Sequence, residues 1–315
     1  VSPAGAAEKK IVMRYSHSSS AMVKEPHHAA ALDFKNYVEK ATNGKVDVQI
    51  YPGSQLGGEE RSFQDIQQGV IQIASLAVNN VTVFSPSMGV FDLPYMFTNY
   101  EDCYKLIDQN WDEINKRMIA ESGNMAVGWL VQGFRVLSNS KRPINTIEDL
   151  KGLKIRVPNN PIMIATFRAW GGEPAPMAWD ETFNALQQKV VDGQENPYPV
   201  FASNKFEEVQ KYVTMWNYSY DIFVLNASGK VWDSLSDEDK AIFDECGKEA
   251  CAAEVVASRE ADDGFRKTVE DAGVQITNLT AEQQAAFKEA CAPVYEKYKD
   301  VIGEDVYAAF GYEFS

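Results

Sequence analysis

Segments with the period of a β-strand alternate with segments with the period of an α-helix, and this alternation limits the possible folds more than any other feature. Apolar residues at every second position predict strands near residues 11–16 and 46–50, and an apolar run predicts a third at 70–76. Helices are predicted between them at about 26–42 and 58–68. A βαβαβ order is typical of a mostly parallel sheet covered by helices. We therefore predict an α/β fold for this part of the chain.

The same alternation returns in residues 152–197. The first strand of this unit carries Arg156 and stops at Pro158, which has no N–H to donate to a neighbouring strand. Asn196 stands in a polar run after the second predicted helix of the unit. Both residues thus fall at strand–loop junctions, where α/β folds place groups that bind ligands. A second α/β unit indicates a second lobe.

A long helix is predicted from Ser236 onward. Ser236 can cap its start, and no proline interrupts the chain until well past Gly273. A helix of roughly 35 residues is about 50 Å long, because each residue adds ~1.5 Å. That length exceeds one small domain, so we expect the helix to lie across both lobes.

Length and charge narrow the class of protein. The 315 residues suffice for two modest hydrophobic cores, and the net charge of −15 argues against a nucleic-acid backbone or an anionic membrane surface as partner. No apolar run reaches the ~18 residues of a membrane-spanning helix. The chain begins with Val1 rather than Met, which fits a secreted protein whose signal peptide has been removed, although an engineered N-terminus would look the same.

Residue types that carry catalysis or bind metals are sparse. The histidines are His17, His27 and His28, and none has a partner at metal-binding spacing, so we expect neither a metal nor a cofactor. Signatures of hydrolases, metalloproteases and nucleotide-binding enzymes are absent, and we expect no catalysis. The four cysteines could form disulfides in an oxidising compartment, but buried free thiols are the expected state.

Several motifs, in order and at matching spacing over nearly the whole chain, resemble one family. They are residues 51–57 (Tyr-Pro-Gly-Ser-Gln-Leu-Gly), 93–95 (Leu-Pro-Tyr), 154–158 (Lys-Ile-Arg-Val-Pro), 174–179 (Pro-Ala-Pro-Met-Ala-Trp), 185–188 (Ala-Leu-Gln-Gln) and 191–197 (Val-Asp-Gly-Gln-Glu-Asn-Pro). With these motifs the chain resembles the DctP-type solute-binding subunits of tripartite ATP-independent periplasmic (TRAP) transporters.

The resemblance implies a two-lobed periplasmic-binding-protein fold, with mixed sheets flanked by helices and a long helix that spans both lobes. We expect lobe I to contain residues 1–133 and 222–262, lobe II to contain residues 134–221 and 263–315, and the ligand cleft to lie between them. The resemblance also implies a periplasmic location and the membrane permease subunits of a TRAP transporter as partner. A monomer is the default expectation.

The resemblance further implies which side chains contact the ligand. Arg156 would bind a carboxylate through two hydrogen bonds, a geometry that a guanidinium provides better than lysine. Arg135 matches a second basic position, Asn196 an amide contact and Trp179 an aromatic wall. Other candidates are polar residues after the first and third strands and a tyrosine of the aromatic segment 212–226. The expected contacts are Arg156, Arg135, Asn196, Trp179, His17, Tyr218 and Asn79.

The expected ligand is a small organic anion, such as a sugar acid or an aromatic acid, because the candidates combine guanidinium groups with aromatic rings. A zwitterion such as ectoine is the alternative, since an aromatic wall can also face a cation. Sialic acid is disfavoured, because residues 75–79 lack the acidic residue that the family's sialic-acid binders carry near the third strand. The motif at 194–197 tells against an ABC-type binding protein. A periplasmic enzyme of unknown reaction is the remaining alternative.

Overall fold

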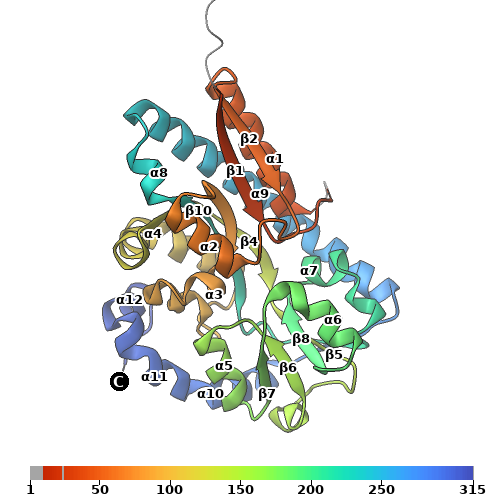
Figure 1. The fold of residues 1–315 in the computed structure, drawn as a ribbon. Coiled ribbons are helices and arrows are strands. Elements are labelled where there is room, and N and C mark those ends of the chain that lie inside the picture. The colour runs from red at the N-terminus through yellow and green to blue at the C-terminus, as the bar shows by residue number, and fades with distance from the viewer. Residues whose placement is uncertain (1–9, 23–24, 315) are drawn as a thin grey trace, which may run out of the picture.

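The computed structural model describes residues 10–22 and 25–314 and contains two β-sheets, each flanked by helices (Figure 1). The residues expected to follow a removed signal peptide lie outside the described part of the chain. Among the described helices, none is long and apolar enough to cross a lipid bilayer. The expected α/β architecture is confirmed, and lobe I and lobe II denote here the two sheets with their helices.

Lobe I is built on a five-stranded mixed sheet. In spatial order its strands are β2 (Val46–Tyr51), β1 (Ile11–His17), β3 (Ile73–Ala77), β10 (Tyr220–Ser228) and β4 (Asn124–Phe134). The helices α1 (Pro26–Ala41) and α2 (Glu59–Gln68) connect the parallel strands β1, β2 and β3, as the alternation predicts. β10 returns antiparallel between β3 and β4. Phe34 of α1 is fully buried, which contributes ~1.5–3 kcal/mol.

Lobe II is built on a six-stranded mixed sheet. In spatial order its strands are β11 (Gln275–Asn278), β9 (Tyr212–Met215), β5 (Val136–Asn139), β8 (Gly193–Asn196), β6 (Lys154–Val157) and β7 (Glu173–Pro176). Helix α5 (Pro161–Ala169) follows β6 and is capped by Asn160, whose side-chain oxygen accepts hydrogen bonds from two backbone N–H groups of the first turn. A 3₁₀ turn (Trp179–Glu181) and α6 (Thr182–Gln187) precede β8.

Two strand segments carry the chain from one lobe to the other. β4 of lobe I leads into β5 of lobe II at Arg135, and β9 of lobe II leads into β10 of lobe I through residues 216–219. The backbone N–H of Arg135 donates a hydrogen bond to the carbonyl oxygen of Ser219 at 2.9 Å, so the two crossings lie side by side. A change in the angle between the lobes must therefore bend or twist these two segments.

The predicted long helix is present as α9 (Asp237–Asp271), 35 residues long and capped by Ser236. It packs against α1 and β4 in lobe I and against α7 (Tyr198–Ser203) in lobe II, so it braces both lobes (Figure 1). A Cβ atom added at Gly128 of β4 would lie 2.6 Å from the Sγ atom of Cys251 on α9. The close contact between this strand and the helix therefore requires glycine.

The remaining helices cover the faces of the sheets and the end of the chain. They are α3 (Val78–Val81), α4 (Tyr100–Ser122), α8 (Gly229–Asp233), α10 (Ala281–Ala290), α11 (Ala292–Ile302) and α12 (Glu304–Ala309). α11 contacts both α5 of lobe II and the 3₁₀ segment Pro86–Asp92 of lobe I. The C-terminal helices thus touch both lobes, and the residue limits that the sequence predicts for the lobes stay a prediction.

Two local predictions are wrong. The sequence after Pro197 predicts a helix near residues 202–211, but the structure has the helix at Tyr198–Ser203, because Pro199 in its first turn favours a start there. Residues 84–97 are rich in Pro, Phe and Met and have no clean period, which predicts a packed loop, but the segment contains the 3₁₀ helix Pro86–Asp92. The four cysteines are free and buried, which confirms the expectation of thiols rather than disulfides.

Candidate functional site

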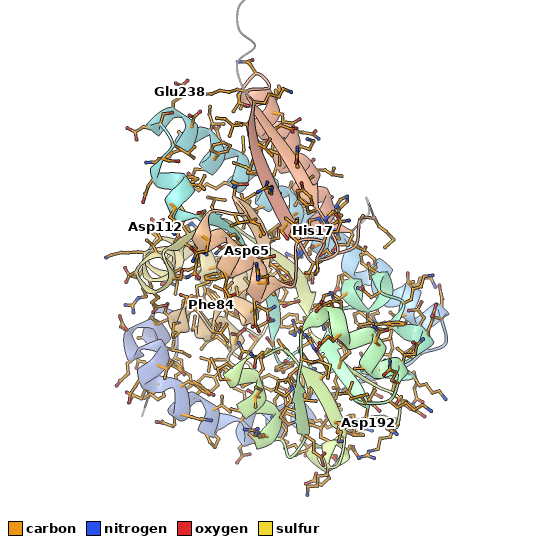
Figure 2. The ribbon with its side chains drawn as sticks, viewed as in Figure 1. His17, Asp65, Phe84, Asp112, Asp192 and Glu238 are labelled. Carbon is orange, nitrogen blue, oxygen red and sulfur yellow. The ribbon has the colours of Figure 1, made fainter. Side chains whose placement is uncertain are left out.

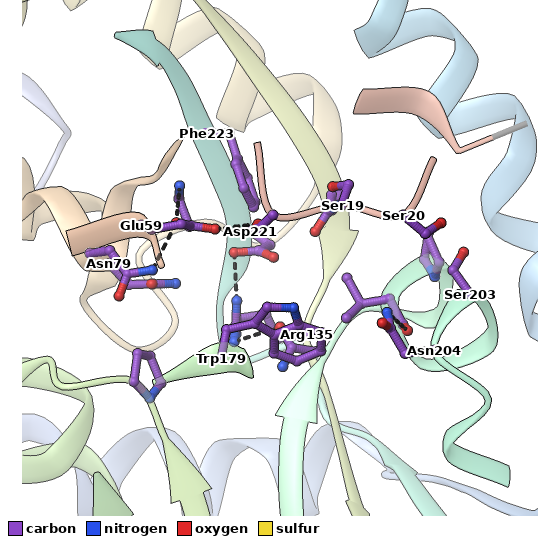
Figure 3. A pocket seen from close by; sticks show the side chains of 18 of the residues that line it. Ser19, Ser20, Glu59, Asn79, Arg135, Trp179, Ser203, Asn204, Asp221 and Phe223 are labelled. Carbon is purple, nitrogen blue, oxygen red and sulfur yellow. Dashed lines mark hydrogen bonds and ion pairs between the residues drawn. The ribbon is translucent and has the colours of Figure 1, made fainter. Parts of the chain in front are cut away.

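A cavity lies between the two lobes, at strand ends of both sheets (Figure 3). Its volume is about 520 Å³, part of which is open to solvent. Lobe I lines it with the loop after β1, with α2 and with the start of β10, and lobe II lines it with β6, β8 and α7. A small molecule held there would touch both lobes.

Arg156 is a buried cation on the floor of this cavity. It lies on β6, is 3% exposed, and its Nε and Nη2 atoms donate hydrogen bonds to the carbonyl oxygen of Met177 at 3.2 and 2.9 Å. No carboxylate of the described residues forms an ion pair with it, and its guanidinium carbon lies 5.7 Å from the centroid of the Trp179 ring. Burial lowers the pKa of Arg156 to about 10, so it remains a cation at neutral pH. A buried cation without a protein anion is suited to a ligand anion.

Arg135 also lines the cavity, but its donors are largely committed to protein groups. It forms an ion pair with Glu195 through Nε and Nη2, and its Nη1 atom donates to Asp221 at 2.5 Å. Its Nη2 atom also donates to the side-chain oxygen of Asn196 at 3.0 Å. Burial acts to lower the pKa of Arg135, but the two carboxylates raise it well above its usual value. The second Nη1 hydrogen is the donor left over for a ligand.

Three further predicted contacts line the same cavity. Asn196 is 6% exposed and fixed by Arg135 on one side and by the side-chain oxygen of Gln194 on the other, to which its Nδ2 atom donates at 2.7 Å. Trp179 is partly buried and packs on Phe206, with ring centroids 5.7 Å apart. Asn79 lies in α3 directly after β3. The structure therefore brings five of the seven predicted residues together.

His17 and Tyr218 lie outside the lining. His17 ends β1 near the gap between the lobes (Figure 2), but its Nε2 atom faces Nδ1 of His28 at 3.0 Å. Burial lowers the pKa of His17 to about 4, so this ring is neutral at neutral pH. Tyr218 is fully buried and its hydroxyl donates to Glu195 at 2.7 Å. Both residues can support the site from behind rather than touch a ligand.

The sequence prediction missed the acidic groups of the lining. Glu25, Glu59 and Asp221 all face the cavity. Burial raises the pKa of Glu25 to about 7 and that of Asp221 to about 6. Their positions could have indicated them, because Glu59 is the first residue of α2, directly after Gly57 and Gly58, and Asp221 is the second residue of β10.

The comparison with known proteins decides the family. The family model described as "Bacterial extracellular solute-binding protein, family 7" (DctP) matches residues 17–300. The chain belongs to the DctP family. Among its relatives, the C4-dicarboxylate-binding periplasmic protein of Rhodobacter capsulatus is 30% identical over 304 residues, which are 95% of this chain and 90% of the relative.

Solved TRAP solute-binding proteins share the fold of this DctP-family protein. The protein of Polaromonas sp. JS666 bound to D-erythronate is 30% identical, with a TM-score of 0.91. The match covers 97% of this chain and 100% of that chain. The sugar acid binding protein of Advenella mimigardefordensis in complex with galactonate is 29% identical with a TM-score of 0.91, covering 96% and 97%. The expected TRAP solute-binding class, its periplasmic location and its non-enzymatic nature are thereby confirmed.

Proposed function

We propose that this protein captures a small organic anion between its lobes and that Arg156 binds the carboxylate of that anion. One observation carries the proposal: Arg156 is buried at the cavity and no carboxylate of the described residues neutralises it. An isolated buried charge is unfavourable, and a bound carboxylate removes that cost through charge-assisted hydrogen bonds. The relatives support this chemistry, because C4-dicarboxylates, D-erythronate and galactonate all carry a carboxylate.

The other lining residues would orient the ligand. The free Nη1 hydrogen of Arg135 and the amide of Asn196 lie within the same network and can contact the carboxylate or a neighbouring polar group. Trp179 would pack on the ligand body, and Asn79 would contact it from lobe I. The ligand favours the closed arrangement of the lobes because both lobes contact it only there.

The captured solute would then pass to the membrane permease subunits of a TRAP transporter, with the protein acting as a monomer. The family to which the chain belongs supports this step. No catalytic step is part of the proposal, because capture and release need only a change in the angle between the lobes at the two strand crossings and along α9.

A thermal-shift screen against organic acids and zwitterions tests the proposed function. A ligand at 100 times its Kd adds about 2.7 kcal/mol to the free energy of unfolding, which raises the melting temperature by several degrees. We expect carboxylates to stabilise the protein and matched neutral amides to leave it unchanged. Stabilisation by the amides alone, or by no compound in a sample shown by mass spectrometry to be ligand-free, would contradict the proposal.

A further inference from the structure

Among the described residues, the wall of the cavity carries more acidic than basic groups. Its acidic residues are Glu25, Glu59 and Asp221, and its basic residues are Arg135 and Arg156. Arg135 is already neutralised by Asp221 and by Glu195 behind the wall. Arg156 is therefore the one lining cation that no carboxylate of the described chain pairs with. The described part of the wall therefore offers an unpaired cation to one ligand carboxylate and none to a second.

Glu59 presents a carboxylate at the wall of the cavity, where hydrogen bonds hold it in place. Its Oε1 atom accepts a hydrogen bond from the hydroxyl of Ser18 at 2.5 Å, and its Oε2 atom accepts from the backbone N–H of Ala77 and from Nδ2 of Asn80, both at 2.8 Å. All three donors are neutral, so they fix the carboxylate in place without cancelling its charge. A carboxylate oxygen accepts two hydrogen bonds, which leaves Oε1 able to accept one more from a ligand.

The opposite end of the cavity offers hydroxyl groups. Figure 3 shows Glu59 and Asn79 at one end and Ser20, Ser203 and Asn204 at the other. The hydroxyl oxygens of Ser20 and Ser203 are buried and have no hydrogen-bond partner among the described residues. The carboxylate of Glu59 at one end can only accept hydrogen bonds, so it needs a donor on the ligand. The amide and hydroxyl groups at the other end can both donate and accept hydrogen bonds. Ligand hydroxyl groups meet both needs, while an ammonium group can only donate.

We infer that the site selects a polyhydroxy monocarboxylate, and that Glu59 accepts a hydrogen bond from a ligand hydroxyl and excludes a second carboxylate. This inference rests on the proposed function, in which Arg156 holds the carboxylate. A dicarboxylate of the same carbon skeleton would bring its second charge to a wall that carries Glu59 and Asp221 and, among its described residues, no cation left without a protein carboxylate. Like charges brought together in a partly desolvated site lower the affinity by about a hundredfold or more.

Calorimetric titration with matched pairs of acids tests the inference. Each pair is an aldonate and the aldarate that differs only by a terminal carboxylate in place of the terminal CH₂OH: D-erythronate with meso-tartrate, and D-galactonate with galactarate. The wild type is expected to bind at least one aldonate about a hundredfold tighter than its aldarate. In Glu59→Gln, we expect the affinity for the aldonate to fall about tenfold. The ratio of aldonate affinity to aldarate affinity should fall at least about tenfold.

The glutamine variant keeps the local fold intact. Its amide oxygen can accept from Ala77 and Asn80, and its NH₂ group can donate to Ser18, so the melting temperature of the ligand-free protein should stay close to that of the wild type. Glu60→Gln is the matched control. It removes one negative charge from the same helix, and Glu60 does not line the cavity. This control should retain the preference of the wild type.

The outcomes separate this inference from the proposed function. Equal affinity of the wild type for aldonate and aldarate would overturn the inference. So would an equal loss of affinity for both acids in Glu59→Gln. A higher affinity for a zwitterion such as ectoine than for every aldonate would overturn it as well. If carboxylates still bind and require Arg156 in those cases, the proposed function stands alone. If no organic acid binds the ligand-free protein, both fail.

Discussion

Replacement of Arg156 by alanine is expected to lower the affinity for the captured carboxylate by at least about a hundredfold, because it leaves a buried anion without its partner. Arg156→Lys should lose part of this affinity too, since a lysine keeps the charge but cannot form two parallel hydrogen bonds to a carboxylate. The ligand-free Arg156→Ala protein should melt at or above the temperature of the wild type. An unpaired buried guanidinium contributes an unfavourable desolvation term, which the variant removes.

Calorimetric titration of the strongest hit from the thermal-shift screen measures the affinity, and melting of the ligand-free variants measures stability. Arg168→Ala is the matched control, because Arg168 lies on α5 of the same lobe with its side chain exposed. It should bind as the wild type does. Retention of near wild-type affinity by Arg156→Ala would show that the carboxylate lies elsewhere.

Replacement of Arg135 by alanine is expected to destabilise the protein by about 3–5 kcal/mol, because it leaves the buried carboxylates of Glu195 and Asp221 facing each other without a cation. At ~2–4 °C per kcal/mol, the melting temperature should fall by roughly 6–20 °C. The loss is large because Arg135 also stands at the crossing of β4 into β5. Its effect on stability is thus opposite to that of Arg156, although both arginines are buried at one cavity.

Differential scanning calorimetry of Arg135→Ala beside the triple variant Arg135→Met, Glu195→Gln, Asp221→Asn tests this account. The triple variant removes the charges together and should recover much of the lost stability, since no unpaired charge remains. A melting temperature of Arg135→Ala within a degree or two of the wild type would contradict the structural role of the ion-pair network.

The long helix and the Arg156 segment could be predicted from sequence because their determinants are local. α9 follows from one cap and an uninterrupted run, and its start falls one residue after the predicted cap. The strand of Arg156 follows from alternation and from Pro158. Helix caps, strand alternation and proline breaks depend on residues that are close together in the chain, so they can be recognised from the sequence.

The partners of Arg135 could not be predicted in the same way. Glu195 and Asp221 lie 60 and 86 residues away along the chain, and the two strand crossings bring them to Arg135. His17 shows a second limit, because successive side chains of a strand and its loop point in different directions. His17 turns toward His28, whereas the serines directly after it line the cavity.

The most direct test of the central claim is a crystal structure of the protein with the strongest carboxylate hit bound. Our account predicts the ligand between the closed lobes, with both carboxylate oxygens within about 3.2 Å of nitrogen atoms of the Arg156 guanidinium. A carboxylate bound outside the cavity, or one held by other groups while Arg156 contacts only the carbonyl oxygen of Met177, would contradict the account.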